Sequence, residues 1–390
     1  MNTQPRNRIK VAQVVTRCAA GAGGVVVRGA LSLDPGRYDV TILTGQTGPL
    51  LDGVEERGVH VVLEPSLVAP ISPKQDSIAL QRLTRLIATS GFDVVHTHSA
   101  KAGAIGRLSA YRARVPVIVH TYHGFPFHDF QNPATRAAYV AIERRLAKIT
   151  DVVLAIGGGV ATEALRRGLA TPANLRTVAP AVEADTVPRT PTSRRAARLL
   201  LGLPDDARVV GTVGRLDYQK APEHFVQAIA ALRNRDAIGC WIGSGDLLEP
   251  TQALVRKLGL ENRFRFAGER HDVPQLLPGL DVFAMSSRYE GLPCALVEAM
   301  RCGVPAAVTA VNSVPDLVVP GETGVLVPSG RPRQLAAGID MLLDHPVSAA
   351  QMAARGLAAA GVAYEASRLG EILDETYTDG LESNLLRAVG

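Results

Sequence analysis

Two glutamates that flank a Gly-Leu-Pro turn have the spacing most suggestive of chemistry in this chain. They are Glu290 and Glu298, in the stretch SRYEGLPCALVEAMRCGVP at residues 287–305. We expect Pro293 to be the first residue of a helix, because its fixed φ and missing N–H suit that position. The free N–H groups and the dipole at a helix start favour an anion. The stretch therefore predicts a phosphate cradle with a carboxylate on each side, which suits a ligand that carries hydroxyl-rich rings.

Two cations follow the strand that we expect at 209–215. Arg215 and Lys220 lie in GRLDYQK (214–220), and both would emerge at the carboxyl end of that strand. Two cations at such a place can hold a diphosphate, with charge-assisted hydrogen bonds worth ~1.5–3 kcal/mol each. The spacing alone is equally compatible with two solvated surface cations.

Histidines gather near the ends of two expected strands in the first half. The segment HTYHGFPFHDF (120–130) contains His120, His123 and His128, and its glycine and proline argue against a metal site. We expect one histidine at this strand end to face a ligand as a hydrogen-bond donor. In DVVHTHS (93–99), we expect at most one of His96 and His98 to face any one side. A structural role is at least as common as a functional one for each of these histidines.

A glycine-rich segment, GAGGVV at 21–26, follows the first expected strand. It resembles half of a dinucleotide-binding fingerprint, which requires an acidic residue at the end of the second strand. Here that strand ends in Thr44 and Gly45, so an NAD-dependent oxidoreductase is disfavoured. Gly23 and Gly24 can still let the backbone approach a ligand closely, or can form a tight turn.

Length and composition limit the class of protein. A chain of 390 residues exceeds the size of a single hydrophobic core, so we expect two domains. The net charge of +5 suits an anionic ligand, but the arginines are spread and aromatic residues make up only 4%, so nucleic acid is not an expected partner. No apolar run approaches the ~20 residues of a membrane span, and the first residues resemble a strand rather than a signal peptide. We expect a cytoplasmic protein. The four cysteines form no C-x-x-C pair, so neither disulfides nor zinc are indicated.

Short apolar runs alternate with helical segments such as 77–91 along the whole chain. Strands are expected at 9–15, 38–44, 59–65, 93–99, 116–123, 151–157, 209–215, 238–245, 263–269, 281–287 and 306–311. Near-continuous apolar strands separated by helices indicate parallel sheets covered on both faces. Two such series indicate two doubly wound α/β domains, joined by a linker at 187–195 that is rich in Pro, Thr and Arg. We expect ligands beyond the carboxyl ends of the strands.

Taken together, these residues resemble the retaining glycosyltransferases of family 4, which have the GT-B fold. The similarity covers nearly the whole chain and is strongest in GRLDYQK (214–220), FAGERHDV (266–273), the stretch 287–305 and GETGVLVP (321–328). The pair Glu290 and Glu298, with seven residues between them, is the most specific signature. The resemblance implies two Rossmann-like domains that face each other across a cleft. Residues 1–188 would bind the acceptor, 189–369 would bind the nucleotide sugar, and a last helix at 370–390 would pack back on the first domain.

The resemblance also implies a role for each matching residue. Arg215 and Lys220 would bind the diphosphate of a UDP-sugar, while Glu298 would bind the ribose and Glu290 the transferred sugar. Arg270 would lie along the base, and His123 would hydrogen-bond the donor sugar near the reacting carbon. The other donor-binding positions would be Gly23, Gly24, Gly291, Leu292, Pro293, Cys294 and Ala295. The catalytic set would be His123, Glu290, Arg215 and Lys220.

The implied mechanism is hexosyl transfer with retention of configuration. Departure of the nucleotide diphosphate leaves an oxocarbenium-like sugar, and the two cations and the helix start stabilise the leaving charge. If the acceptor enters on the leaving-group face, retention requires neither a protein nucleophile nor a metal. We therefore expect no metal and no cofactor besides the donor substrate.

Two stretches depart from the family pattern. The family usually has a Gly-Gly pair before its Pro-Glu, where this chain has VNSVPDL (311–317). It usually has a Pro-Asn-Gly turn after the last strand of the first domain, where this chain has APAVEAD (179–185). The first departure would alter contacts with the donor sugar, and the second would change only a hinge.

The acceptor is indicated by thinner signals in the first half. GAGGVVVRGALSLDP (21–35) and HTHSAKAGAIGR (96–107) resemble the enzymes that add the second sugar during aminoglycoside assembly. We expect a small polar acceptor of the aminocyclitol or paromamine type, bound by His98 and Asp129, and at most weak membrane association. The main alternative is a glycosyltransferase of polysaccharide or lipid-linked glycan assembly. A sugar-nucleotide 2-epimerase and a non-catalytic sugar-nucleotide sensor are further alternatives. The sequence does not define the oligomeric state.

Overall fold

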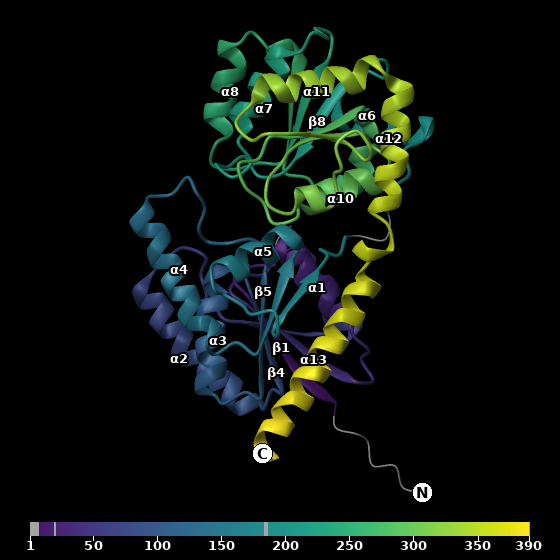
Figure 1. Ribbon diagram of the computed structural model, residues 1–390. Helices are drawn as coiled ribbons and strands as arrows, with labels where there is room; N and C mark the ends of the chain where they lie inside the picture. Colours follow the sequence, from purple (N-terminus) through teal and green to yellow (C-terminus); the bar gives the residue numbers. More distant parts are fainter. Residues whose placement is uncertain (1–7, 19–20, 183–185, 390) are drawn as a thin grey trace, which may run out of the picture. The chain divides into compact units, whose positions relative to one another are not determined.

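The computed structural model describes residues 8–18, 21–182 and 186–389, which form two compact units (Figure 1). Unit 1 comprises Met1–Val182 together with Glu365–Gly390, and unit 2 comprises Glu183–Tyr364. The sequence places the corresponding boundaries nearby, at 188 and 369. Residues 183–185 of the stretch APAVEAD, expected to change a hinge, lie outside the described residues.

Unit 1 is built on a parallel sheet of seven strands. Their order in the sheet is β3-β2-β1-β4-β5-β6-β7, so the winding reverses between β1 and β4. The strands are β1 (Ile9–Val15), β2 (Tyr38–Thr44), β3 (His60–Leu63), β4 (Val94–His98), β5 (Val117–Tyr122), β6 (Val152–Ile156) and β7 (Leu175–Val178). The helices are α1 (Ala22–Ser32), α2 (Pro73–Ser90), α3 (Ala100–Arg112), α4 (Pro133–Ala147), α5 (Gly158–Arg166) and the terminal α13 (Ala366–Val389).

Unit 2 repeats this architecture with six parallel strands. Their order is β10-β9-β8-β11-β12-β13, with the reversal between β8 and β11. The strands are β8 (Val209–Val213), β9 (Ile238–Ile242), β10 (Phe264–Gly268), β11 (Val282–Met285), β12 (Ala306–Thr309) and β13 (Val325–Val327). The helices are α6 (Pro191–Leu201), α7 (Pro222–Ala231), α8 (Leu248–Lys257), α9 (Val273–Leu276), α10 (Cys294–Arg301), α11 (Pro332–Asp344) and α12 (Pro346–Ala359).

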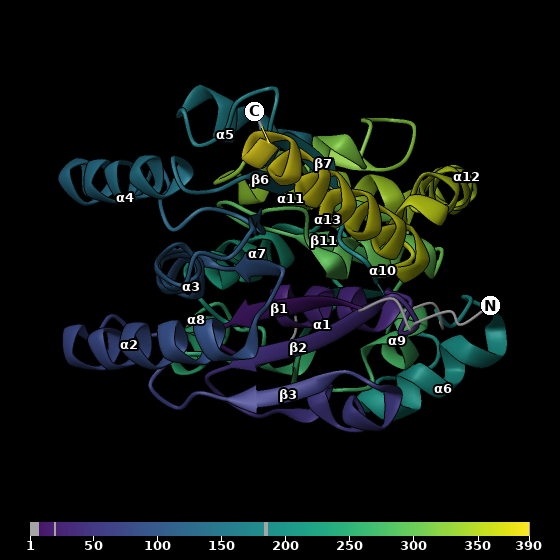
Figure 2. The ribbon, with the colours of Figure 1, turned by 90° about the horizontal axis from the view of Figure 1, so that it is seen from below.

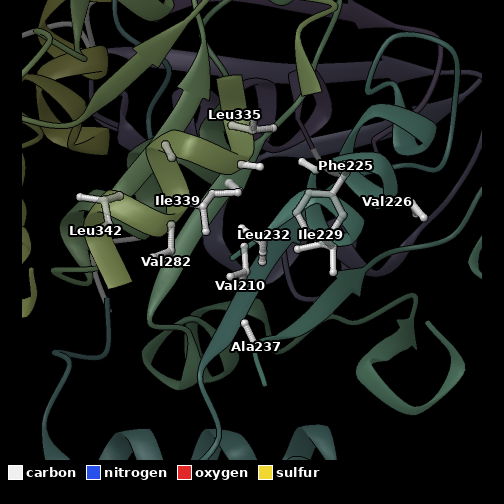
Figure 3. Packing of buried hydrophobic residues seen from close by; sticks show 14 of the residues in the cluster. Val210, Phe225, Val226, Ile229, Leu232, Ala237, Val282, Leu335, Ile339 and Leu342 are labelled. Carbon is white, nitrogen blue, oxygen red and sulfur yellow. The ribbon is translucent and has the colours of Figure 1, made fainter. Parts of the chain in front are cut away.

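Apolar side chains on both faces of each sheet drive this layering. In unit 2, Phe225 and Ile229 of α7 and Ile339 of α11 pack against Val210 and Val282 of the central strands (Figure 3). All five side chains are buried, as expected for parallel strands covered by helices. This core holds the carboxyl ends of β8 and β11, and with them the loops that follow, in fixed positions.

In unit 1, α2 and α3 lie side by side on one face of the sheet (Figures 1 and 2). The other face is covered by α1 and by α13, which returns from the end of the chain to lie beside α1 (Figure 1). Close approach of these two helices depends on Gly29, because a Cβ there would lie 3.0 Å from Leu373 Cδ1. The terminal helix is therefore an integral layer of unit 1.

All eleven strands predicted from the sequence are present, with ends that differ by a few residues. Two short edge strands, β7 and β13, were not predicted from the sequence. Each is flanked by only one neighbouring strand and is partly exposed. The sequence of β7, LRTV, lacks a continuous apolar run, and β13, VLV, is apolar but only three residues long.

Candidate active site

The carboxyl ends of β8 and β11 meet at the topological switch point of unit 2, where doubly wound folds bind ligands. The loop after β8 carries Arg215 and Lys220, and Asp217 organises it. One oxygen of Asp217 accepts a hydrogen bond from Lys220 N at 3.0 Å, and the other lies 2.8 Å from Arg215 Nη2. Trp241 Nε1 donates to Gly214 O at 2.9 Å, which anchors the start of the loop to β9.

Lys220 and Glu290 form a direct ion pair, with Nζ 2.6 Å from Oε1. Ser287 Oγ donates to the same carboxylate oxygen at 2.6 Å, and Gln219 Nε2 donates to Oε2 at 3.0 Å. The carboxylate is 4% exposed and the lysine 17% exposed. Three donors therefore hold the Glu290 carboxylate in one orientation at the ends of β8 and β11.

Asn312 fixes the backbone of the same loop. Its Oδ1 accepts a hydrogen bond from Glu290 N at 2.9 Å. Asn312 has φ 44°, a left-handed conformation that asparagine tolerates better than most residues that have a Cβ. This residue begins the Asn-Ser pair that stands where the family has Gly-Gly. The asparagine thus adopts a left-handed conformation that glycine also adopts easily, and it adds a side-chain hydrogen bond that glycine cannot make.

The helix α10 begins one residue later than we predicted. Pro293 precedes its first residue and has an extended ψ of 119°, and its carbonyl accepts a hydrogen bond from Leu296 N at 3.0 Å. The prediction of Pro293 as the first helical residue is therefore wrong by one position, because its carbonyl already caps the helix while its ψ remains extended. Gly291, Leu292 and Pro293 are buried, and Cys294 and Ala295 are half-buried.

The two remaining donor-site candidates of unit 2 lie on neighbouring elements. Glu298 is half-buried on α10, in the helix that follows the Glu290 loop. Arg270 follows β10 and forms a two-point ion pair with Asp272, with Nε to Oδ1 at 2.8 Å. Arg215 is more open, with 58% of its side chain exposed. Their contacts with a nucleotide remain predictions.

In unit 1, a chain of buried polar side chains lies at the switch point between β1 and β4. His98 Nε2 is 2.6 Å from Gln13 Oε1, and His98 Nδ1 is 3.0 Å from His123 Nε2. Gln13 Nε2 donates to the hydroxyl of Tyr377 on α13 at 2.8 Å. That hydroxyl also lies 2.7 Å from His96 Nδ1. We call these five residues the histidine relay.

The relay corrects two expectations from the sequence. His96 and His98 share one face of β4, with ring centroids 4.2 Å apart, because residues two apart in a strand point the same way. His98 is 3% exposed, and both its ring nitrogens are engaged within the protein, so it has none free for an acceptor molecule. It contacts His123 instead.

Gln13 and Tyr377 were not among the predicted site residues. Gln13 interrupts the apolar run of the first strand at a position that pairs in register with His96. A buried glutamine in a central strand must find hydrogen-bond partners, and this was the available signal. Tyr377 reaches the site only because α13 returns to unit 1, which local sequence patterns do not encode.

Burial keeps four histidines of unit 1 neutral: His96, His98, His120 and His123. Desolvation lowers the pKa of His96 to about 3 and that of His123 to about 4. It also holds the pKa of His98 and His120 well below the ordinary value, and the nearby Arg107 guanidinium lowers the pKa of His120 further. A neutral imidazole has one donor and one acceptor nitrogen, so each ring has a defined hydrogen-bond polarity.

Other candidates in unit 1 have mainly structural surroundings. His120 is buried, with Nδ1 2.9 Å from Thr97 Oγ1. Asp129 is 82% exposed and pairs with Arg136 at 2.7 Å, so its role in acceptor binding stays a prediction. Gly23 and Gly24 lie in the first turn of α1, where a Cβ would come within 2.8 Å of Cys18 Cα or Arg28 Nη2 respectively. Close packing against backbone thus accounts for Gly23, whereas the neighbour of Gly24 is the end of the Arg28 side chain. The contact of either glycine with a donor stays a prediction.

Within the described parts of the chain, no group of three or more His, Cys, Asp or Glu side chains is arranged to hold a metal ion. Metal independence itself remains a prediction. Among the same residues, no helix is both long and apolar enough to cross a bilayer.

Comparison with known proteins gives the same family for both units. Residues 20–181 match the model of the glycosyl transferase 4-like domain, and residues 194–358 match that of glycosyl transferases group 1. An Escherichia coli UDP-Gal:α-D-GlcNAc-diphosphoundecaprenol α-1,3-galactosyltransferase is 28% identical over 312 residues, which cover 78% of this chain and 80% of that enzyme. A Mycobacterium bovis D-inositol 3-phosphate glycosyltransferase is 34% identical over 65% of this chain, and the aligned part spans only 54% of that relative.

Solved structures agree in fold. Anabaena HepE, in complex with UDP and glucose, superposes with a TM-score of 0.81 at 20% identity, covering 95% of this chain and 100% of that one. Sucrose-phosphate synthase from Thermosynechococcus elongatus has the same TM-score and identity, covering 96% and 100%. With both family models matched and two doubly wound units present, this chain belongs to the family 4 glycosyltransferases and has the GT-B fold.

Proposed function

We propose that the protein transfers a hexose or amino-hexose from a UDP-sugar to a hydroxyl group of an acceptor glycan, with retention of anomeric configuration. The ion pair between Lys220 and Glu290 carries this proposal, because it joins the cation expected to bind phosphate to the carboxylate expected to bind sugar hydroxyls at one switch point. UDP is preferred because Anabaena HepE was solved with UDP and with UDP-glucose.

The proposed chemistry depends on stabilising the leaving UDP. Lys220, Arg215 and the start of α10 supply positive charge near the expected diphosphate, so the bond between the anomeric carbon and the phosphate oxygen can break heterolytically. The Glu290 carboxylate is engaged by three donors, which suits it to orienting sugar hydroxyls rather than to attacking the anomeric carbon. Retention would follow if the acceptor hydroxyl attacks from the side of the leaving phosphate and transfers its proton to it.

For the acceptor we favour a saccharide of lipid-linked or polysaccharide assembly. The Escherichia coli relative acts on a sugar linked to undecaprenol by a diphosphate, and the alignment covers most of both chains. A paromamine-type aminocyclitol is the second candidate. It is favoured by the resemblance of 21–35 and 96–107 to aminoglycoside enzymes, and the mycobacterial relative, named for inositol phosphate, acts on another cyclitol.

The test is UDP release, with product mass and anomeric configuration, for a panel of UDP-hexoses. Each donor is offered alone, with a GlcNAc-diphosphate-lipid analogue, and with paromamine. Release stimulated by one acceptor, with a mass gain of one sugar, identifies the acceptor class. Release without any acceptor, accompanied by an epimerised sugar, would replace the proposal by a 2-epimerase. Binding of UDP without turnover of any donor would favour a sensor.

A further inference from the structure

The histidine relay connects the terminal helix to the loop after β5 through side chains that are almost fully buried. Gln13, His96 and Tyr377 are each no more than 1% exposed. Every link is a hydrogen bond of 2.6–3.0 Å. In such surroundings each bond must have one donor and one acceptor, so the proton positions along the relay depend on one another.

The amide of Gln13 sets the direction of these bonds. Its Nε2 donates to the Tyr377 oxygen, which leaves Oε1 directed at His98 Nε2. A carbonyl oxygen only accepts, so His98 carries its proton on Nε2 and accepts at Nδ1. His123 Nε2 lies 3.0 Å from that nitrogen and must therefore be the donor. The neutral ring of His123 then has no proton on Nδ1.

The second nitrogen of His123 is the end of the relay that is open to a ligand. Nδ1 forms no hydrogen bond with any described residue, and it is not among the buried polar atoms that lack a partner. His123 itself is only half-buried, unlike the other four members of the relay. The relay thus leads from a buried tyrosine to an accessible imidazole nitrogen at the carboxyl end of β5.

We propose that Gln13 and Tyr377 are positioning residues that fix the tautomer of His123, so that its Nδ1 accepts a hydrogen bond from a hydroxyl group of the sugar donor. The assignment of the hydroxyl to a sugar rests on the proposed function. The tautomer itself depends only on the relay. It reverses our expectation that a histidine at this strand end acts as a hydrogen-bond donor. A ligand group that can only accept, such as an ether oxygen or a fluorine, would be rejected there.

Tyr377 is what holds the amide of Gln13 in its orientation. Its hydroxyl accepts from Gln13 and can donate to His96 Nδ1, whose other nitrogen lies 2.7 Å from Thr121 Oγ1. In a Tyr377→Phe variant the amide could turn over and donate to His98. The tautomers of His98 and His123 would then both reverse, and His123 would present Nδ1–H to the ligand.

The chain offers a matched control for this substitution. Tyr38 also contacts α13, where its hydroxyl donates to Asp374 Oδ1 at 2.7 Å, and its ring lies 6.1 Å from that of Tyr377. Tyr38→Phe removes one hydroxyl from the same helix contact, keeps the ring that lies against Tyr377, and breaks no hydrogen bond of the relay. A general loosening of α13 would affect both variants, whereas the tautomer should respond only to Tyr377→Phe.

The deciding measurement is two-bond ¹H–¹⁵N correlation NMR of histidine in the full-length, nucleotide-free protein. The His123 signal is identified by its loss in His123→Gln. We expect a single tautomer with unprotonated Nδ1 in the wild type and in Tyr38→Phe, and a second tautomer in Tyr377→Phe. A wild-type His123 protonated on Nδ1 overturns the proposal without any variant. So does an unchanged tautomer in folded Tyr377→Phe.

A second experiment tests the ligand with monodeoxy and monodeoxyfluoro analogues of UDP-glucose, measured by UDP release. At one sugar position, both the fluoro and the deoxy analogue should have a kcat/KM about fivefold to tenfold lower than that of UDP-glucose. That loss should vanish in His123→Gln. An equal loss of kcat/KM for analogues altered at every sugar position would refute the hydroxyl contact. If NMR shows the expected tautomer but no UDP-sugar is turned over, the relay stands and the proposed function fails.

Discussion

The Nζ atom of Lys220 lies 2.6 Å from Oε1 of Glu290, so the residue expected to bind the diphosphate is paired with the residue expected to bind the transferred sugar. The pair holds both side chains at the switch point before a donor arrives. Binding of a diphosphate would then give Lys220 a second anion without first having to order it. Such preorganisation lowers the entropic cost of binding.

Removing the lysine should therefore cost both activity and stability. Lys220→Met leaves a largely buried carboxylate without its cation, and breaking a buried pair in this way costs ~3–5 kcal/mol. We expect loss of UDP-sugar turnover and a correspondingly lower free energy of unfolding for unit 2. Urea titration followed by the fluorescence of Trp241, the single tryptophan, measures this directly.

Arg215→Met is the matched comparison for that experiment. Arg215 is mostly exposed and pairs with Asp217 at 2.8 Å, and exposed ion pairs contribute only ~0–1 kcal/mol. Turnover should fall with little change in stability. Equal stability losses in the two variants would contradict the view that Lys220 is a buried partner of Glu290.

Asn312 should contribute separately through its conformation and its side chain. Asn312→Gly keeps the left-handed φ and loses the hydrogen bond to Glu290 N, whereas Asn312→Ala also incurs ~1–2 kcal/mol for a Cβ in that conformation. We expect the alanine variant to be the less stable. In both, KM for the UDP-sugar should rise because the Glu290 loop is less fixed. Equal stabilities with an unchanged KM would show that the hydrogen bond does not position the loop.

The two-domain architecture follows from local sequence, because the apolar runs of parallel central strands are continuous and distinctive. Glu290, Lys220 and Arg215 were also predicted, since they lie in short motifs close to strand ends. Gln13 and Tyr377 were not. They lie 364 positions apart in the chain and meet only because α13 folds back over the sheet of unit 1. The pairing of Glu290 with Lys220 likewise depends on the reversal of strand order between β8 and β11, which a linear pattern does not reveal.

Turnover should not require a divalent metal ion. Lys220, Arg215 and the start of α10 would stabilise the negative charge of the leaving diphosphate. The chain has no D-x-D pair at the end of a strand that could hold a metal ion on the diphosphate. UDP release should be unchanged after treatment with EDTA and dialysis. A loss of activity that Mg²⁺ or Mn²⁺ restores would contradict this expectation.

Unit 1 should lose stability as the pH falls below about 6.5. His96, His98, His120 and His123 have lowered pKa values in the folded protein, so the unfolded chain binds more protons than the folded one in this range. Each contributes a loss of about 1.4 kcal/mol per pH unit until its own folded pKa is reached, about 4 for His123 and about 3 for His96.

Hydrogen exchange of peptides from β4 and β5 between pH 7 and pH 5 measures this effect in unit 1, with exchange rates corrected for their intrinsic pH dependence. His120→Gln should make the decline shallower by about 1.4 kcal/mol per pH unit, because one proton-binding difference is removed. His120 is enclosed by Thr97 and Arg107 on the face opposite to the relay, so the tautomer of His123 is not disturbed. An identical slope in His120→Gln and the wild type would show that this histidine is not held neutral by burial.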